Sequence, residues 1–286
     1  MRLGDDGSDN FIDRTGSSGS GFGGGGNMLG CLLPLVASRF GLVGVAVLLL
    51  GYCALTSLGG GGGLLPGSGS APEASAPSGQ STLTAENRKL LSGVLLSTEQ
   101  VWGEIFQRSG QTYQPPQMVA YSNTDQSGCG VAQAAMGPFY CPTDSRIYID
   151  PQFFDELSRR FQAPGDGAQA YVIAHEVGHH IQNLEGTLDR AQSSQARSSA
   201  AAGNAVQVGV ELQADCYAGV WAKRSGALEA GDIEEGMRAA EAIGDDMLTQ
   251  GRVSPDNFTH GTSAQRQEAL NRGLQSGDPA QCNYAR

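Results

Sequence analysis

The stretch 171–180, Tyr-Val-Ile-Ala-His-Glu-Val-Gly-His-His, constrains this chain more than any other part of its sequence. It contains the pattern His-Glu-x-x-His within a largely apolar run. Asp166, with Gln169 three residues later, fits the capping box that starts a helix, and Gly186 suits the cap at its end. The sequence therefore predicts one helix that carries the whole stretch.

Two of the histidines share a face of that helix. His175 and His179 are four residues apart, which at about 100° per residue places them only about 40° apart around the axis. His180 is about 140° from His175, so we expect it to point elsewhere and to pack or form hydrogen bonds. Two imidazoles at this spacing, with Glu176 after the first, are typical of a zinc site with a general base.

Catalytic zinc takes three protein ligands and leaves one position open, so a third ligand is needed. Glu185 lies ten residues after His175, where one class of zinc protease places that ligand. The arrangement needs a glycine seven residues after the first histidine to turn the chain back, and the residue here is Gln182. If the helix continues, Glu185 lies about 80° round the axis and more than a turn beyond His179. We expect Glu185 to be a solvated residue instead.

The remaining candidate is Glu211, which lies with Asp215 in the helix-compatible stretch 208–222. These two carboxylates are four residues apart and share a face, and on an otherwise apolar helix they are costly to bury unless they meet a cation or donors. Glu211 can complete a His, His, Glu site. Asp215 can accept the free ring N–H of a zinc-binding histidine and fix its tautomer. The alternative is an acidic helix that faces solvent.

Composition divides the chain into four parts. Glycine accounts for 42 residues, many of them before residue 80. Residues 1–39 begin with a Gly/Ser/Asp-rich tail that we expect to be disordered. Residues 40–58 carry no charge and are long enough for one transmembrane helix, and residues 59–80 form a Gly/Ala/Pro/Ser linker. Residues 81–286 show the mixed periodic pattern of one globular domain.

The distribution of basic residues predicts the orientation. Arg2, Arg14 and Arg39 precede the apolar stretch, and the next basic residue after it is Arg88. This predicts a cytoplasmic N-terminus and an extracytoplasmic domain. A cleaved signal peptide is the alternative, but its charged region and cleavage site match weakly and the preceding chain is long. The net charge of -11 argues against nucleic acid as a partner.

Four cysteines in the domain agree with export: Cys129, Cys141, Cys216 and Cys282. An even number in an exported domain suggests two disulfides. Of the three possible pairings we favour Cys129–Cys141, which closes a short Gly-containing loop, and Cys216–Cys282, which would pin the C-terminus to the core. The alternative is four reduced, buried thiols in a cytosolic protein. Cysteine ligation of zinc is less favoured because no C-x-x-C pair is present.

Local patterns predict further elements around the helix. Apolar positions over residues 83–108 recur with a helical period. Residues 117–122 and 146–150 are predicted to be short strands, and the second could pair with an extended peptide by strand addition. Residues 187–204 are hydrophilic and lack an apolar stripe, so we expect an exposed insertion near the mouth of a cleft.

Three strings together resemble a known family. They are Gly-Pro-Phe-Tyr-Cys-Pro-x-Asp at 137–144, Ala-Tyr-Val-Ile-Ala-His-Glu-Val-Gly-His-His at 170–180 and Glu-Leu-Gln-Ala-Asp-Cys-Tyr-Ala-Gly-Val-Trp at 211–221. The His-Glu-x-x-His…Glu-x-x-x-Asp pattern resembles the gluzincins, zinc metallopeptidases with a glutamate ligand. Over about residues 80–286 the strings resemble the bacterial "putative neutral zinc metallopeptidase" family. The resemblance implies an α+β, mostly helical, zincin-like domain with a small β-sheet, outside the cytoplasm behind one membrane anchor.

A fourth stretch, Thr-His-Gly-Thr-Ser-Ala-Gln-Arg at 259–266, resembles the Thr-His-Pro-Ser…Arg stretch of membrane-associated gluzincins. It has Gly261 where those proteins have proline. Its Thr262 and the glutamine three residues later fit a second capping box, which places His260 just before a helix. We expect His260 or Arg266 to point into the cleft. The alternative is a structural role for both residues.

The predicted site is one zinc ion held by His175, His179 and Glu211. Glu176 would take the proton of the attacking water and pass it to the leaving amine. His260 would stabilise the oxyanion, with Tyr171 and Tyr217 as rival donors. We therefore expect a membrane-anchored zinc peptidase that acts on extracytoplasmic proteins or peptides. The alternatives are a latent or non-catalytic zinc-binding domain that serves as a tethered interaction module, and hydrolysis of another amide such as a cell-wall peptide crosslink.

Overall fold

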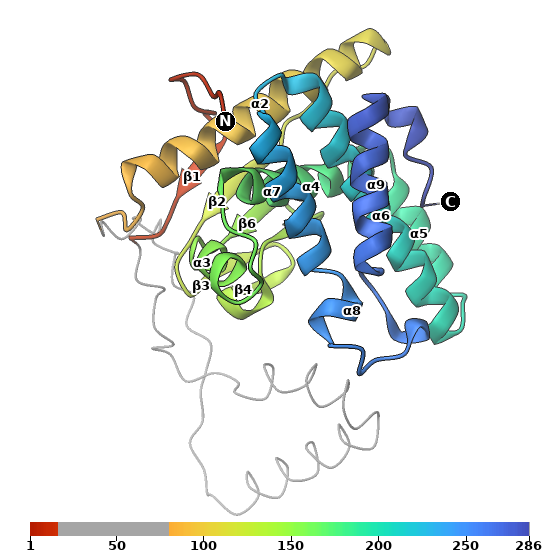
Figure 1. Ribbon diagram of the computed structural model, residues 1–286. Helices are drawn as coiled ribbons and strands as arrows, with labels where there is room; N and C mark the ends of the chain where they lie inside the picture. The colour runs from red at the N-terminus through yellow and green to blue at the C-terminus, as the bar shows by residue number, and fades with distance from the viewer. Residues whose placement is uncertain (17–79, 286) are drawn as a thin grey trace, which may run out of the picture. The chain divides into compact units, whose positions relative to one another are not determined.

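The computed structural model describes residues 1–16 and 80–285 (Figure 1). Its larger sheet has four strands in the order β1-β2-β6-β5. The strands are β1 (Phe11–Asp13), β2 (Gln117–Ala120), β6 (Arg146–Ile149) and β5 (Phe139–Cys141). The first three run parallel, and β5 is antiparallel to β6. The strands predicted at 117–122 and 146–150 are therefore present, and both lie inside the sheet.

Strand β6 cannot serve as the edge that we expected to accept an extended peptide. It pairs with β2 on one side and with β5 on the other, so its backbone groups are already used by the sheet. Strand β5 ends the order of this sheet, and no strand of residues 1–16 and 80–285 pairs with its outer edge. A second sheet of two strands, β3 (Thr124–Ser127) and β4 (Gly130–Gln133), forms an antiparallel hairpin.

The first sixteen residues are folded, which corrects the expectation that the chain begins with a disordered tail. Strand β1 adds to β2 with Ile12 opposite Val119, and Ile12 packs against the small cluster of buried residues around Val119. The glycine and serine content of the whole N-terminal region hid this short apolar pair, Phe11 and Ile12. A strand of three residues is too short to produce a detectable alternation.

Helices make up most of the remaining described chain. The long ones are α2 (Ala85–Arg108), α4 (Asp166–Leu184), α6 (Ala200–Ser225) and α9 (Ser263–Ser276). The shorter ones are α3 (Gln152–Arg159), α5 (Thr187–Gln195), α7 (Ala230–Ala242) and α8 (Asp245–Leu248). Figure 1 shows α6 and α9 side by side, with α2 running past the sheet. The main core lies where α2, α4, α6 and α9 meet, and includes Trp102, Ile173 and Trp221. The described part is thus α+β and mostly helical, as predicted.

Helix α4 begins differently from the prediction. Asp166 is the first residue of the helix, and the N-cap residue, Gly165, has no side chain to form a capping hydrogen bond. Gly165 precedes it with φ 113°, a backbone conformation that favours glycine. The N–H of Gly167 donates instead to Oε2 of Glu235 on α7, at 3.0 Å. A carboxylate from a distant helix therefore does the capping. At the other end Gly186 has φ 68°, as a C-terminal glycine should.

Two disulfides hold the fold, with the predicted pairing of Cys129–Cys141 and Cys216–Cys282. The predicted transmembrane helix at 40–58 lies outside the described residues, as does nearly all of the linker at 59–80. Among the helices of residues 1–16 and 80–285, none is both long enough and apolar enough to cross a membrane.

Candidate metal centre

The predicted metal ligands come from two helices that pack closely against each other. Helix α4 supplies His175 and His179, and α6 supplies Glu211. The helices can approach because Gly178 has no side chain: a Cβ there would lie 2.9 Å from Cα of Ala214. Such a distance is too short for two carbon atoms, so glycine at this position lets the Glu211 face of α6 reach the histidine face of α4.

The three ligand atoms form one cluster. One atom from each of His175, His179 and Glu211 lies within 4.8 Å of the others. Oε2 of Glu211 is 3.2 Å from Nε2 of His175 and 3.7 Å from Nε2 of His179. In a tetrahedral zinc site with ligands at 2.0–2.2 Å, neighbouring ligand atoms are about 3.4 Å apart. The donor set and its spacing therefore fit a zinc ion.

His175 is held by a buried network on its other ring nitrogen. Oδ1 of Asp215 lies 2.8 Å from Nδ1 of His175 and also accepts from the hydroxyl of Tyr171 at 2.6 Å. Arg266 donates to both carboxylate oxygens of Asp215 at 2.9 Å. Burial acts to raise the pKa of Asp215, but Arg266 and His175 hold it below its ordinary value. Because the ionised carboxylate only accepts, Nδ1 of His175 carries the proton and Nε2 is free to bind a metal.

His179 is held in the same way by a residue that sequence reasoning did not single out as a partner. Oε1 of Gln182 lies 2.9 Å from Nδ1 of His179. The amide nitrogen of Gln182 donates to the carbonyl of Val210 and to Oε1 of Gln213, at 2.8 and 3.0 Å. These two acceptors fix which end of the amide faces the histidine. Nδ1 of His179 is therefore the donor, and Nε2 faces the cluster.

Glu211 presents one oxygen to the histidines and uses the other elsewhere. Its Oε1 accepts a hydrogen bond from Nε2 of Gln207 at 3.0 Å, which leaves Oε2 between the two imidazoles. Burial acts to raise the pKa of Glu211, yet the adjacent His179 and His175 hold it well below the usual range. The side chain of Glu211 is therefore deprotonated, as a carboxylate must be to bind a metal.

The electrostatics of the cluster favour a cation at this point. Burial opposes a charge on His175, but Asp215 and Glu211 together raise its pKa to about 10. The same carboxylate, Glu211, raises the pKa of His179 against the effect of burial. A proton or a metal ion between these ligands would relieve the repulsion of the facing lone pairs.

Glu176 is buried at the metal cluster with unused bonding capacity. Its side chain is about 7% exposed, and its Oε2 has no hydrogen-bond partner within residues 1–16 and 80–285. Burial raises its pKa above the ordinary value for a glutamate. Buried polar atoms are nearly always hydrogen-bonded in folded proteins, so an unsatisfied one that lines a cleft marks a place for a polar ligand.

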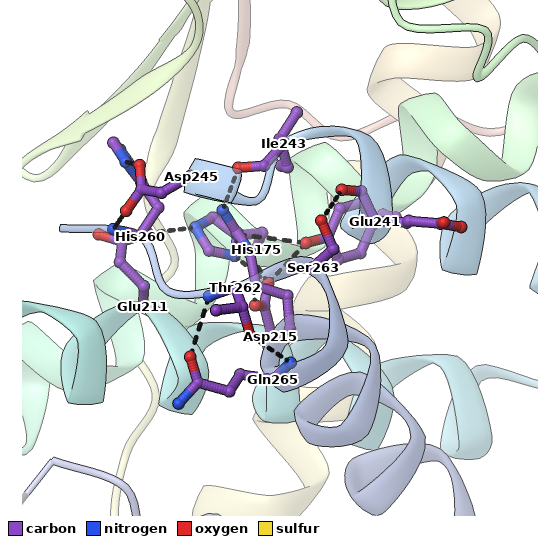
Figure 2. A network of polar contacts seen from close by, with 12 residues as sticks. His175, Glu211, Asp215, Glu241, Ile243, Asp245, His260, Thr262, Ser263 and Gln265 are labelled. Carbon is purple, nitrogen blue, oxygen red and sulfur yellow. Dashed lines mark hydrogen bonds and ion pairs between the residues drawn. The ribbon is translucent and has the colours of Figure 1, made fainter. Parts of the chain in front are cut away.

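His260 lies at the cleft and is oriented by Asp245 at the start of α8. Nδ1 of His260 is 3.0 Å from Oδ1 of Asp245, while Oδ2 accepts the backbone N–H groups of Thr259 and His260 at 2.7 Å each. Figure 2 shows this pair together with the contacts that link His175 to Asp215 and Glu211. The capping box of Thr262 is present at the start of α9.

The remaining candidates are engaged in other contacts. The hydroxyl of Tyr217 donates to Glu185 at 2.8 Å, and Glu185 is exposed and outside the metal cluster. The hydroxyl of Tyr171 donates its hydrogen bond to Asp215. His180 is buried away from the cluster: its Nδ1 lies 3.1 Å from the hydroxyl of Tyr140 and its Nε2 lies 2.6 Å from the carbonyl of Gln114. The helical geometry predicted this separation of His180 from His175.

A cleft of about 770 Å³ opens over these residues. Phe139 and Tyr140 of β5 and Phe153 of α3 contribute aromatic side chains to its lining, and Gln192 and Gln195 of α5 with Gln207 of α6 contribute amides. The segment 187–204, expected as an exposed insertion, forms α5 and the start of α6, and Gln192 and Gln195 in it line the cleft. The lining also includes the three candidate ligands and the residues around them: His175, Glu176, His179, Glu211, His260 and Arg266.

Comparison with known proteins agrees with this geometry. The family model described as "Putative neutral zinc metallopeptidase" matches residues 2–285. The protein named "Uncharacterized protein YpfJ" of Escherichia coli K12 is 46% identical over 283 residues, which cover 96% of this chain and 95% of that protein. "Uncharacterized protein Rv2575" of Mycobacterium tuberculosis H37Rv is 43% identical over 188 residues, 60% of this chain and 62% of that protein. No solved structure matches the chain.

Proposed function

We propose that this chain, which belongs to the neutral zinc metallopeptidase family, hydrolyses peptide bonds in extracytoplasmic proteins or peptides. The observation that carries the proposal is Glu176, which is buried beside the His175, His179 and Glu211 cluster, lines the cleft and has a carboxylate oxygen without a hydrogen-bond partner among the described residues. A structural zinc site is closed by four protein ligands and needs neither a cleft nor a base.

Each of these residues has a separate task in the proposed reaction. His175, His179 and Glu211 would hold the zinc ion. When bound, zinc acts as a Lewis acid that polarises a carbonyl and makes a water molecule more acidic. Glu176 takes the proton of the attacking water and delivers it to the nitrogen of the leaving amine. Burial raises its pKa above the ordinary value, a direction that suits a group which both accepts and releases a proton.

We assign to His260, which lines the cleft, the stabilisation of the negative charge that develops on the carbonyl oxygen. Nδ1 of the ring is engaged by Asp245, so Nε2 is the ring nitrogen left to act as a donor toward a substrate. Such a donor acts only where charge develops in the transition state. Arg266, in contrast, is fully buried and bonded to Asp215, which makes it a positioning residue for His175.

Substrate binding is supported by the free edge of β5. Phe139 and Tyr140 of this strand line the cleft, and the outer edge of β5 is unpaired in the described sheet. An extended peptide could add to this edge by main-chain hydrogen bonds and pass over the metal cluster. The extracytoplasmic site of action is supported by the two disulfides, which persist in oxidising compartments. Membrane attachment through residues 40–58 stays a prediction.

The test compares the full chain with Glu176→Gln. The protein is produced under oxidising conditions, zinc is quantified per chain, and cleavage of a peptide library is followed by mass spectrometry. Glu176→Gln should keep its zinc and lose at least about 10²-fold in kcat/KM, because the general base is gone. His260→Gln should also keep zinc and lose about 10²–10³-fold in kcat. If wild type holds zinc but cleaves nothing that Glu176→Gln leaves intact, the peptidase proposal is wrong.

A further inference from the structure

The two ends of the segment 17–79 meet in the structure. The N–H of Thr82 donates to Oγ1 of Thr15 at 3.0 Å, and the hydroxyl of Ser81 lies 3.4 Å from the same Thr15 oxygen. Ser81 also donates to Oδ2 of Asp13 at 2.5 Å, and Arg88 pairs with that carboxylate. The described residues on either side of this segment, 13–15 and 81–82, therefore lie next to each other.

Contacts along the whole N-terminal segment, residues 1–16, hold it on elements that come after residue 80. Glu99 of α2 accepts from Ser8 at 2.5 Å and from Asn10 at 2.9 Å. The backbone N–H of Arg2 donates to the carbonyl of Ala227 at 2.7 Å. Strand β1 then completes the sheet beside β2. A Cβ on Gly7 would come within 2.5 Å of the hydroxyl of Ser92, so the fit is close at this point too.

We propose that the N-terminal segment and the metal-binding unit, residues 80–285, occupy the same side of any membrane that residues 40–58 enter. Strands β1 and β2 share backbone hydrogen bonds, and the uncharged stretch 40–58 lies between them in the chain. One crossing would place the two strands on opposite sides of a bilayer about 30 Å thick and break the sheet. Residues 17–79 therefore cross a membrane an even number of times or not at all.

The arginines that predicted a cytoplasmic N-terminus have other partners in the fold. Nε of Arg2 lies 3.2 Å from Glu229, and Arg14 lies 3.0 Å from Asp125. Both carboxylates belong to the metal-binding unit. The charge pattern before residue 40 thus serves the docking of the N-terminal segment, which removes two of the three residues from the argument for a single crossing. The two disulfides then place the shared side in an oxidising compartment.

Chemical crosslinking of the full chain in cells tests the docking. Nζ of Lys89 and Oδ1 of Asp5 are 2.7 Å apart, and both side chains are accessible. A zero-length carbodiimide should join them as an amide with loss of water. The chain has one other lysine, Lys223, so a crosslinked peptide is readily assigned to one of the two lysines. We expect a linked pair of peptides containing Asp5 and Lys89 by mass spectrometry. The matched control, Asp5→Asn, lacks the carboxyl group and should not give it.

Thiol labelling in intact cells decides the sidedness independently of the crosslink. Asp9→Cys and Gln275→Cys each add a thiol at an exposed position, one in the N-terminal segment and one on α9. A membrane-impermeant maleimide should label the two variants equally, as measured on the peptide that carries each cysteine. Labelling of Gln275→Cys with protection of Asp9→Cys would overturn the proposal, as would the reverse. Equal labelling of both variants supports the proposal, whereas labelling of neither would contradict the oxidising compartment that the disulfides indicate.

Discussion

At the scale of single residues, the side chains behind the metal ligands determine how the ligands can act. Asp215 and Gln182 each accept a hydrogen bond from Nδ1–H of one histidine, so that both Nε2 atoms face Glu211. Asp215 is in turn held by Arg266, and Gln182 by Val210 and Gln213. The cluster is therefore oriented by the protein before any metal binds. Residues that orient metal ligands typically contribute about 10–100-fold to metal affinity.

The substitution Gln182→Met tests this orienting role. Methionine keeps the volume and helix propensity of glutamine but cannot accept the hydrogen bond from Nδ1–H of His179. Zinc affinity should therefore fall by about 10–100-fold. Competition with a chelator measures the affinity, and circular dichroism confirms that the variant is folded. The exposed Gln275→Met on α9 is the matched control and should bind zinc like wild type. Equal affinity in both variants would contradict the role given to Gln182.

Prediction from sequence was most successful at this scale where geometry alone decided the outcome. The helical angle separated His180 from His175 and left Glu185 outside the cluster, and the structure agrees on both. Gln182 was noticed only as a residue that is not glycine. Its partners, Val210 and Gln213, lie on another helix, and no local pattern shows that an amide will meet them.

At the scale of elements, the site depends on how closely α4 and α6 approach. Gly178 lies between the two histidines along α4, and Ala214 lies between the two carboxylates along α6. The two residues face each other where the helices touch. The small residues at this contact fix the separation of the helices, and hence the distances among the three ligands. The ligand set predicted that the two helices meet, but not that Gly178 lies at their contact, because this glycine looks unfavourable when α4 is considered alone.

Alanine at Gly178 should therefore weaken both the fold and the site. The added Cβ would lie 2.9 Å from the backbone of Ala214, so the helices must move apart, at a cost of about 1–3 kcal/mol in the free energy of unfolding. Zinc affinity should fall with it. Apart from the backbone of its own helix and its two neighbours, no atom of the described residues lies within 4 Å of the Cβ position of Gly103 on α2, so Gly103→Ala should instead stabilise the fold by about 0.5–1 kcal/mol. Urea unfolding measures the change in the free energy of unfolding for both variants. A change of the same sign in the two would contradict the role given to Gly178.

The remaining elements show which signals a sequence carries and which it lacks. Helix α2 and strands β2 and β6 were predictable because each has a periodic apolar pattern over several residues. Strands β1 and β5 have three residues each, too few for a period. The start of α4 was mistaken because Glu235, which caps it, comes from α7. Tertiary contacts decide in these cases.

At the scale of the whole molecule, the disulfides tie peripheral segments to the site. Cys282 is joined to Cys216 on α6, one residue after Asp215, and its carbonyl accepts from Gln213 at 2.8 Å. The C-terminal segment is thereby fixed next to the helix that supplies Glu211. The second disulfide ties β5, which borders the cleft, to the end of the β3–β4 hairpin.

The two disulfides should differ in their contribution to stability. Cys216 and Cys282 are 66 residues apart and Cys129 and Cys141 only 12, so the first closes the larger loop in the unfolded chain. Replacing both cysteines of a pair by serine should lower the free energy of unfolding by about 4 kcal/mol for the first and about 3 kcal/mol for the second. Urea unfolding of the two double variants checks the order, and a larger loss from the shorter loop would contradict it.

The central claim is that His175, His179 and Glu211 together hold one zinc ion. X-ray absorption at the zinc edge, with metal analysis of the full chain, measures it most directly. We predict one zinc per chain, two imidazole nitrogens and a carboxylate oxygen at about 2.0–2.2 Å, and no sulfur. The zinc should be lost in Glu211→Ala and retained in Glu185→Ala. Retention in Glu211→Ala with loss in Glu185→Ala, or sulfur among the ligands, would contradict the claim.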